Sequence, residues 1–367
     1  GYGVDQLTEI EKIIGGKQGD TFNGLVGGFV LDGDDGSDRL DLSALSARID
    51  ARLNAGGSNV GSAGISMSVA NIEEISGGSV GDSLVGDAAA NIFLGNGGSD
   101  TLEGGLGNDS LYGGDGDDVL AGNEGDDLLV GNAGNDLADY SAATASTPLT
   151  VDLGLIDGAS QTYAKLDGGT TYGVDSLYSI ELINAGQGDD LVRGIQQGVT
   201  LNGNAGFDTL DLTSLGSQRL KVDFNAGKIQ TFDGGSTYTD QQSVSNFEKA
   251  IGGGGQDTFI GQSGNINNEF DGGSDPEVFL AVVTDVAQRI LDPGLGLFQR
   301  QLAVLDLHRR RLALLVGDRQ VRATEVRRQE RLHHREERDV VLGAVEAVAL
   351  VGEQHVADRQ VVLLHRG

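Results

Sequence analysis

The sequence predicts an all-β fold, a solenoid of parallel strands stacked coil upon coil. A nine-residue repeat through the middle of the chain and a composition unsuited to an ordinary core predict it. The 367 residues include 60 glycines and no cysteine or tryptophan, and their formal net charge is −30. Glycine loses much conformational freedom on folding, and like charges in register repel one another. Something outside the chain must offset both costs.

The repeat fills residues 95–139 with five consecutive nonapeptides: GNGGSDTLE, GGLGNDSLY, GGDGDDVLA, GNEGDDLLV and GNAGNDLAD. The fourth position is always glycine and the sixth always aspartate, and the eighth is leucine except at Ala138. The first six residues predict a turn, since glycine permits positive φ. The last three predict a short strand whose middle side chain points inward. Because two nonapeptides make one coil, we expect each repeat to lie over the next but one.

The five nonapeptides resemble the RTX, or hemolysin-type, calcium-binding repeat GGxGxDxUx, in which U is a large apolar residue. This resemblance implies a parallel β-roll that binds several Ca²⁺ ions between its turns. Calcium takes roughly six to eight oxygen ligands from carboxylates and carbonyls, which stacked turns can supply. The alternative is that the aspartates are solvated turn formers, but five of them in register favour calcium.

The family's pattern implies three calcium sites in the array, each joining two aspartates from stacked turns. The pairs are Asp100 with Asp118, Asp109 with Asp127, and Asp118 with Asp136. The implied carbonyl ligands belong to Asn96, Gly98, Gly113 and Asp115 in the first site, Gly105, Gly107, Gly122 and Glu124 in the second, and Gly114, Gly116, Gly131 and Ala133 in the third. Asparagine replaces the second glycine in three turns, a mild departure because asparagine tolerates left-handed conformations.

A longer repeat surrounds the array. Each copy has an apolar residue followed by glutamate, and then a glycine-rich turn with an acid. The apolar-Glu pairs are Ile10-Glu11, Ile72-Glu73, Ile180-Glu181 and Phe247-Glu248. Successive pairs are 62, 108 and 67 residues apart, and the second distance includes the 45-residue array. Without the array, the three distances are similar. These units predict further short coils, with longer excursions on one side.

Acids outside the array extend the calcium prediction. GDDGSD and GNAGFD turns place Asp38 and Asp208 at the position of the array aspartates, although neither has a tandem partner. The acids that follow the apolar-Glu pairs are only slightly better explained as calcium ligands than as plain turn residues; they are Asp20, Asp82, Asp189 and Asp257.

Composition divides the chain further. Residues 276–367 hold 14 arginines, 13 acids, all five histidines and no serine, asparagine, lysine, tyrosine or methionine, whereas residues 1–275 hold 42 of the 55 acids and 54 of the 60 glycines. We predict degenerate RTX-like units in 1–94, the tandem array in 95–139, further degenerate units in 140–275, and a distinct tail in 276–367. This tail is either a helical cap or a secretion domain, with helices in EVFLAVVTDVAQRIL and RRQERLHHREERD, or the result of a reading-frame or strand error. We favour the error because the change falls inside a motif.

The acidic chain disfavours nucleic acid and anionic membranes as partners. No apolar run approaches the roughly 20 residues that span a bilayer. Residues 1–275 contain no histidine, so a histidine-dependent triad cannot lie there, and we predict no enzymatic activity for this chain.

The resemblance implies a secreted protein of a Gram-negative bacterium, extracellular or at the cell surface. It also implies export by a type I secretion apparatus and folding on calcium outside the cell. The long period of the surrounding units favours a structural or adhesive role. The alternative is a C-terminal secretion and folding module of a toxin or an exoenzyme, such as a protease, lipase or alginate epimerase, whose active domain lies elsewhere.

Overall fold

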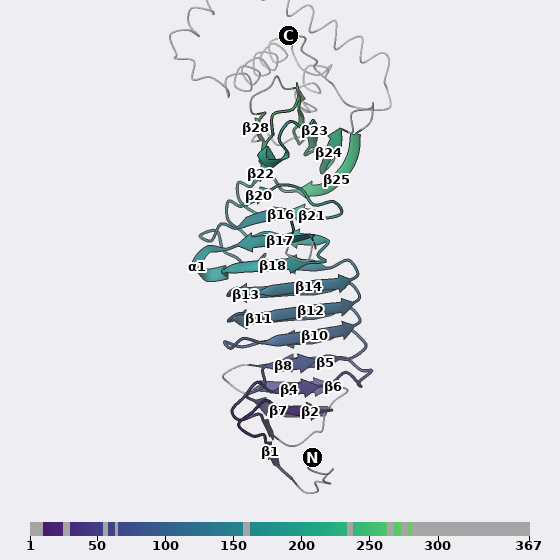
Figure 1. Ribbon diagram of the computed structural model, residues 1–367, viewed down its shortest axis with the longest axis vertical. Helices are drawn as coiled ribbons and strands as arrows, with labels where there is room; N and C mark the ends of the chain where they lie inside the picture. Colours follow the sequence, from purple (N-terminus) through teal and green to yellow (C-terminus); the bar gives the residue numbers. More distant parts are fainter. Residues whose placement is uncertain are drawn as a thin grey trace, which may run out of the picture. The chain divides into compact units, whose positions relative to one another are not determined.

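The computed structural model describes residues 10–24, 30–53, 58–62, 65–156, 162–232, 238–262, 268–272 and 278–280. The chain divides into two compact units, Gly1–Ser214 with Gln241–Lys249 and Leu215–Asp240 with Ala250–Gly367. The regular secondary structure of the described parts of both units is almost entirely β-strand, and the strands are joined by turns (Figure 1). The segments 1–94, 95–139, 140–275 and 276–367 were predicted from sequence pattern, whereas these two units are defined by compactness. The four segments therefore stay a prediction.

The tandem array forms the middle of the first unit. Its strands are β10 (Ile92–Gly97), β11 (Thr101–Leu106), β12 (Ser110–Asp115), β13 (Val119–Glu124), β14 (Leu128–Ala133) and β15 (Leu137–Asp139). Strands β10, β12 and β14 pair in parallel in one sheet, and β11, β13 and β15 pair in parallel in the other (Figure 1). Leu102 lies opposite Leu120, eighteen residues along the chain. The prediction that each nonapeptide lies over the next but one is therefore confirmed.

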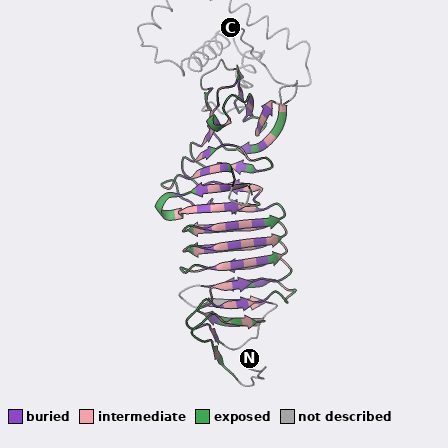
Figure 2. Ribbon diagram, in the orientation of Figure 1, coloured by how far each residue is buried: buried purple, intermediate pink, exposed green. Residues whose placement is uncertain are grey.

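The inward side chains of these strands form one continuous column. In Figure 2, buried and partly exposed positions alternate along each strand of the array. The column residues are fully buried, with exposed fractions of 0%; they are Phe93, Leu102, Leu111, Leu120, Leu129 and Ala138. This column is the hydrophobic core of the array, and it holds the turns at fixed spacing.

We expect Leu111→Ala to lower the free energy of unfolding of the full chain in calcium by roughly 2–5 kcal/mol, because truncation leaves a cavity in a packed column. Urea unfolding followed by far-ultraviolet circular dichroism measures this. Ser110→Ala is the matched control, since Ser110 lies on the same strand and is only partly buried. Equal unfolding midpoints for the two variants would contradict the assignment of the core.

Short coils precede the array. Their strands are β1 (Lys12–Ile14), β2 (Thr21–Asn23), β3 (Val30–Asp32), β4 (Arg39–Asp41), β8 (Glu74–Ser76) and β9 (Ser83–Val85). An excursion of three antiparallel strands, β5 (Ile49–Arg52), β6 (Ser58–Ser62) and β7 (Ile65–Ala70), is inserted between β3 and β9 in the sheet of β11. The predicted additional coils are thus present.

A second excursion follows the array. It consists of β16 (Thr150–Ile156), β17 (Thr162–Asp167), the four-residue helix α1 (Gly169–Tyr172) and β18 (Val174–Tyr178). These strands belong to the sheet of β10 and β12, whereas β5–β7 belong to the other sheet. The prediction that excursions lie on one side is therefore wrong. Each coil contributes one strand to each sheet, so an insertion can extend either of them.

Coils resume after this excursion. Their strands are β19 (Leu182–Asn184), β20 (Leu191–Arg193), β21 (Thr200–Asn202) and β22 (Thr209–Asp211), followed by the 3₁₀ turn Thr213–Leu215. Strand β19 pairs with β15 and β21, and β20 pairs with β16 and β22, all in parallel. Residues Ser243–Ser245, at the end of β25 (Tyr238–Ser245), pair in parallel with β21.

The second unit repeats the same elements on a smaller scale. Its strands include β23 (Leu220–Asp223), β24 (Lys228–Phe232), β27 (Thr258–Ile260), β28 (Glu269–Asp271) and β29 (Val278–Leu280), while β26 (Lys249–Ile251) begins at the last residue of the first unit. Strand β23 is antiparallel to β24 and parallel to β27, which in turn pairs with β29.

Strand β29 corrects one prediction for the tail. We expected a helix in EVFLAVVTDVAQRIL, but its residues Val278–Leu280 form a strand that pairs with Thr258–Ile260. These apolar residues suit a strand that continues the ladder. The remainder of the tail, with the choice between a cap and a frame error, lies outside the described residues. Among the described residues the longest α-helix is α1, far short of a bilayer-spanning helix.

Candidate metal sites

The turns of the array share a backbone conformation that brings carbonyl oxygens between neighbouring coils. Their second and fourth residues have positive φ, as at Asn96 (70°) and Gly98 (104°). The carbonyl oxygens of Asn96 and Gly98 lie directly against Gly114 and Gly116 of the next coil, where a Cβ would clash. Asparagine is thus accommodated at the second position, as predicted from its tolerance of left-handed conformations.

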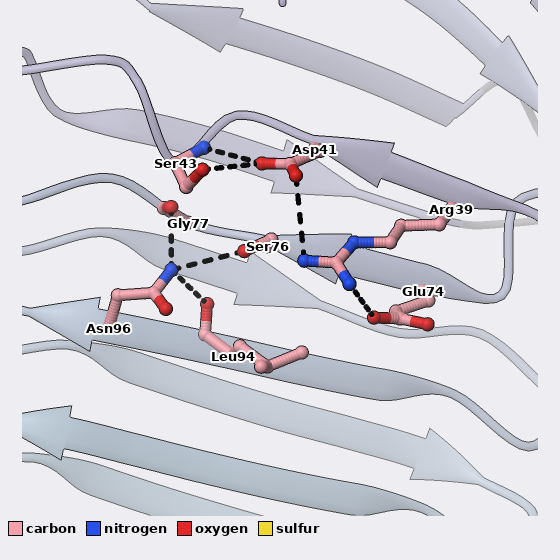
Figure 3. A network of polar contacts seen from close by, with 8 residues as sticks. All are labelled: Arg39, Asp41, Ser43, Glu74, Ser76, Gly77, Leu94 and Asn96. Atoms are coloured by element: carbon pink, nitrogen blue, oxygen red, sulfur yellow. Dashed lines mark hydrogen bonds and ion pairs between the residues drawn. The ribbon is translucent and has the colours of Figure 1, made fainter. Parts of the chain in front are cut away.

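The side chain of Asn96 also connects two coils. Its Nδ2 donates hydrogen bonds to Gly77 O at 2.8 Å and to Ser76 Oγ at 3.1 Å (Figure 3). The same face carries an ion pair between Arg39 and Glu74 at 3.1 Å. Polar side chains therefore tie the preceding coils to the first turn of the array.

The aspartates of the sixth position are buried and linked from coil to coil. Their exposed fractions do not exceed 3%. The backbone N–H groups of the first three donate to Oδ1 of the array aspartate one coil further; these hydrogen bonds are Asp100 to Asp118 at 2.7 Å, Asp109 to Asp127 at 2.7 Å, and Asp118 to Asp136 at 2.9 Å. The structure thus brings together the three pairs that the sequence analysis implied.

The second carboxylate oxygen of these aspartates has no hydrogen-bond donor among the described residues. This holds for Oδ2 of Asp100, Asp109, Asp118, Asp127 and Asp136. Each Oδ2 lies against the first glycine of its own turn, at Gly95, Gly104, Gly113, Gly122 and Gly131 respectively. At Gly95 and Gly104 the carbonyl oxygens of Gly113 and Gly122 converge on the same point. A buried charged oxygen without a partner is costly, so this arrangement fits a bound cation.

The electrostatics lead to the same conclusion. Burial raises the pKa of Asp100 and of Asp109 to about 7, and the carboxylate one coil further adds to the effect, although a backbone N–H opposes it. Burial also raises the pKa of Asp127 and of Asp136 to about 6. Without a cation, these carboxylates would retain protons at pH values where aspartate is normally ionised.

The remaining predicted ligands are backbone carbonyls in the same stacked turns. Asp115 O and Ala133 O accept hydrogen bonds from Gly98 N and Gly116 N, both at 2.8 Å, and each carbonyl keeps a second lone pair. Gly107 O and Gly116 O lie against Gly125 and Gly134 of the following coils. The others lie at strand ends in register with neighbouring turns; they are Gly105, Gly114, Glu124 and Gly131.

Side chains alone do not form a metal site here. No group of three histidine, cysteine, aspartate or glutamate side chains converges anywhere in the described residues. A cation between the turns would therefore take most of its ligands from carbonyl oxygens. Calcium accepts such ligands in flexible geometry, whereas zinc prefers nitrogen and sulfur.

Comparison with known families agrees with this geometry. Residues 76–111, 103–138 and 249–265 match the family model of the RTX calcium-binding nonapeptide repeat, in four copies. The chain carries RTX calcium-binding repeats. They imply Ca²⁺ binding, and the predicted all-β fold with parallel strands built on these repeats is confirmed. Comparison with curated proteins gave no match.

Two turns outside the array have the same open geometry. Asp38 and Asp208 are fully buried, and their Oδ2 atoms have no donor among the described residues. Their Oδ1 atoms accept hydrogen bonds from Asp20 N and Asp190 N, both at 2.8 Å. Burial raises the pKa of Asp208 to about 7. We call a turn open when its aspartate Oδ2 lacks a donor in this way.

Other turns are closed by the backbone. Asp82 accepts hydrogen bonds through Oδ1 from Ile49 N and through Oδ2 from Gly78 N, both at 2.7 Å. Asp20 likewise accepts a hydrogen bond from Gly16 N at 2.5 Å. Neither Gly78 nor Gly16 is among the residues with positive φ. These aspartates therefore have the geometry of plain turn residues.

Two acids were misjudged or missed from sequence. Asp189 is exposed, and its neighbour Asp190 occupies the buried position, where it accepts hydrogen bonds from Leu149 N and Gly186 N. The repeat GNEGDDLLV, in which the second of two aspartates fills the sixth position, gave the signal that identifies Asp190. Asp175 was not singled out; its Oδ1 accepts the Asp127 N–H at 2.9 Å and its Oδ2 accepts the Tyr140 hydroxyl at 2.7 Å. In the second unit, Asp257 Oδ1 accepts Leu220 N at 2.9 Å.

Proposed function

We propose that this chain is a calcium-gated folding segment of a secreted bacterial protein. The observation that carries the proposal is the row of buried aspartate oxygens without donors in the open turns, joined at several of them by a carbonyl oxygen from the next coil. A divalent cation would neutralise the charge and satisfy these oxygens together. Asp100, Asp109, Asp118, Asp127 and Asp136 would hold the ions of the array.

Calcium binding would be coupled directly to folding. The sites require two stacked coils and do not exist in an unfolded chain, so the binding free energy contributes to folding free energy. Extracellular calcium modules bind with dissociation constants of roughly 10⁻⁴–10⁻³ M. Cytosolic calcium is too low to fill such sites. The chain would remain unfolded inside the cell and would fold once outside.

This dependence suits export in an unfolded state. In the proposal, a type I secretion apparatus of a Gram-negative bacterium threads the chain, which then folds outside the cell or at its surface. The solenoid itself serves a structural or adhesive role and is not an enzyme, because its acids act as ligands. The coils and excursions on both sides of the array support this role, since they make up most of the described chain.

A calcium titration of the full chain tests the proposal. Far-ultraviolet circular dichroism should show a cooperative gain of β-signal with calcium, starting from chain kept in chelator. Magnesium is the control; it demands octahedral geometry and gives up its water reluctantly, so it should not fold the chain. A full β-signal in chelator would overturn the proposal, because the aspartates would then need no cation.

A further inference from the structure

Three short turns return the chain to the coil path after an excursion. The acid that accepts the backbone N–H of Asp100, Asp109 or Asp118 follows eighteen residues later, whereas for Asp38, Asp136 and Asp208 it follows after 35, 45 and 40 residues. There the chain uses three residues: asparagine or serine, an apolar residue and glutamate. We call these segments re-entry turns; they are Asn71–Glu73, Ser179–Glu181 and Asn246–Glu248.

The glutamate of each re-entry turn takes the place of an RTX aspartate. In the array, the backbone N–H of Asp100 donates to Asp118 Oδ1 at 2.7 Å. The corresponding hydrogen bonds to glutamate Oε2 are Asp38 to Glu73 at 2.8 Å, Asp136 to Glu181 at 3.0 Å, and Asp208 to Glu248 at 2.9 Å. The longer glutamate side chain thus reaches the position that a full turn would give to aspartate.

The first residue of each re-entry turn supplies the carbonyl. In the array, Gly113 O lies over Gly95, the first glycine of the turn below. The same contact is made by Asn71 O over Gly33, Ser179 O over Gly131, and Asn246 O over Gly203. These three residues have left-handed φ values of 50°, 50° and 55°. That conformation is uncommon for residues other than glycine, above all for serine. It recurs at the three positions where the carbonyl oxygen points toward the first glycine of the preceding turn.

Each re-entry turn lies over an open RTX turn. Asp38, Asp136 and Asp208 are fully buried, and their Oδ2 atoms have no donor among the described residues. Each Oδ2 lies against the same glycine as the carbonyl oxygen from above. The middle residues of the re-entry turns are buried and fix the turns in place; they are Ile72, Ile180 and Phe247.

We propose that the three re-entry turns complete three further calcium sites, over Asp38, Asp136 and Asp208. Each site combines an aspartate and a glutamate from different coils with backbone carbonyls, an all-oxygen set of the kind that calcium prefers. The two carboxylates balance the charge of one divalent cation. This inference rests on the proposed calcium function, and it assigns a role to the apolar-Glu pairs that the repeat pattern leaves unexplained.

Glutamine substitution separates the charge of the glutamate from its hydrogen bond. In the full chain, E73Q/E181Q/E248Q keeps an oxygen that accepts the aspartate N–H but removes the negative charge at all three sites. Glu103→Gln is the matched control, since Glu103 is exposed on β11 and is no ligand. Equilibrium dialysis with radioactive calcium counts the bound ions and gives their affinities.

We expect three ions of the triple variant to bind at least about tenfold more weakly, since charge count tunes calcium affinity, while the control matches the wild type. The single variant E181Q should weaken one ion and stands in if the triple variant fails to fold. An unchanged ion count and affinity in E181Q would overturn the re-entry sites. A wild-type chain that binds no calcium would instead overturn the proposed function.

Discussion

Asp109→Asn is expected to stabilise the calcium-free chain while weakening its binding of calcium. Asp109 Oδ1 accepts the Asn91 N–H at 2.7 Å, and asparagine can keep that hydrogen bond. Its Oδ2 is buried without a donor, and burial raises its pKa to about 7. Near pH 8 the folded calcium-free chain therefore holds a desolvated charge, and removing it should gain roughly 1–3 kcal/mol.

The same substitution should cost calcium affinity. Asparagine offers a neutral oxygen where calcium needs a carboxylate, so the site shared by Asp109 and Asp127 should weaken about tenfold or more. The chain itself contains a related turn, at residues 86–91, where Asn91 stands at the aspartate position and accepts a hydrogen bond from Asp87 N. In that turn Asn91 Oδ1 lies against Gly86, the first glycine, where the aspartate Oδ2 lies in the open turns.

Folding in chelator by trimethylamine N-oxide, an osmolyte that favours the folded chain, and calcium dialysis, both on the full chain, measure the two effects. Asp117→Asn is the control, because Asp117 is exposed and asparagine can keep the hydrogen bond that its Oδ1 accepts from Asn135 N at 2.9 Å. It should leave the number of bound calcium ions unchanged. If Asp109→Asn destabilised the calcium-free chain, or left calcium affinity intact, the open turn would not be the ligand site.

The array was predictable because its sequence repeats three constraints together. Glycine at the fourth position and aspartate at the sixth fix a turn and a ligand in every nonapeptide, and leucine at the eighth, or Ala138 in the last, supplies the inward side chain. The excursions lack such a period. Nothing in Ile49–Ala70 or Thr150–Tyr178 indicates which sheet will receive them, since their alternating residues suit either face.

The open and closed turns differ in a way that sequence records only in part. In most open turns the fourth residue is a glycine with positive φ, such as Gly36, Gly98 and Gly206. In the closed turn of Asp82 the corresponding residue is Val80, for which such a φ would be strained. Gly188 breaks the rule, because its turn is closed although glycine stands there.

The partners of Asp38 and Asp208 could not be found from spacing. The acids that complete their coils lie 35 and 40 residues away, after excursions of unequal length. The apolar-Glu pairs were visible in the sequence as a recurring motif. Their proposed role as ligands depends on a three-residue re-entry turn that takes the place of a six-residue RTX turn. Only the stacked coils bring each glutamate over its aspartate.

Lowering the pH is expected to raise the stability of the folded calcium-free chain and to lower the affinity of its sites for calcium. In the folded calcium-free chain, burial raises the pKa of Asp100, Asp109 and Asp208 to about 7 and that of Asp136 to about 6. In the unfolded chain the same groups titrate near 3.8. Between these values the folded chain binds more protons than the unfolded chain, so its stability rises as the pH falls from about 8 to about 4.

Calcium binding should change in the other direction. The ligand carboxylates must be ionised to hold the cation, so protons compete with calcium as the pH falls below about 7. The affinity of the folded sites for calcium should therefore decrease between pH 7.5 and pH 5.5, while β-signal in chelator increases over the same range. Calcium dialysis in trimethylamine N-oxide, an osmolyte that favours the folded chain, measures the affinity, and circular dichroism measures the β-signal.

High salt separates buried carboxylates from the general charge of the chain. The net charge of −30 also opposes folding, and protonation relieves it, but salt screens repulsion between exposed charges far more than the cost of a buried one. The pH dependence in chelator should therefore persist in high salt, and Asp109→Asn should reduce it. A dependence abolished by salt would place its origin in surface repulsion, and the buried aspartates would then not control folding.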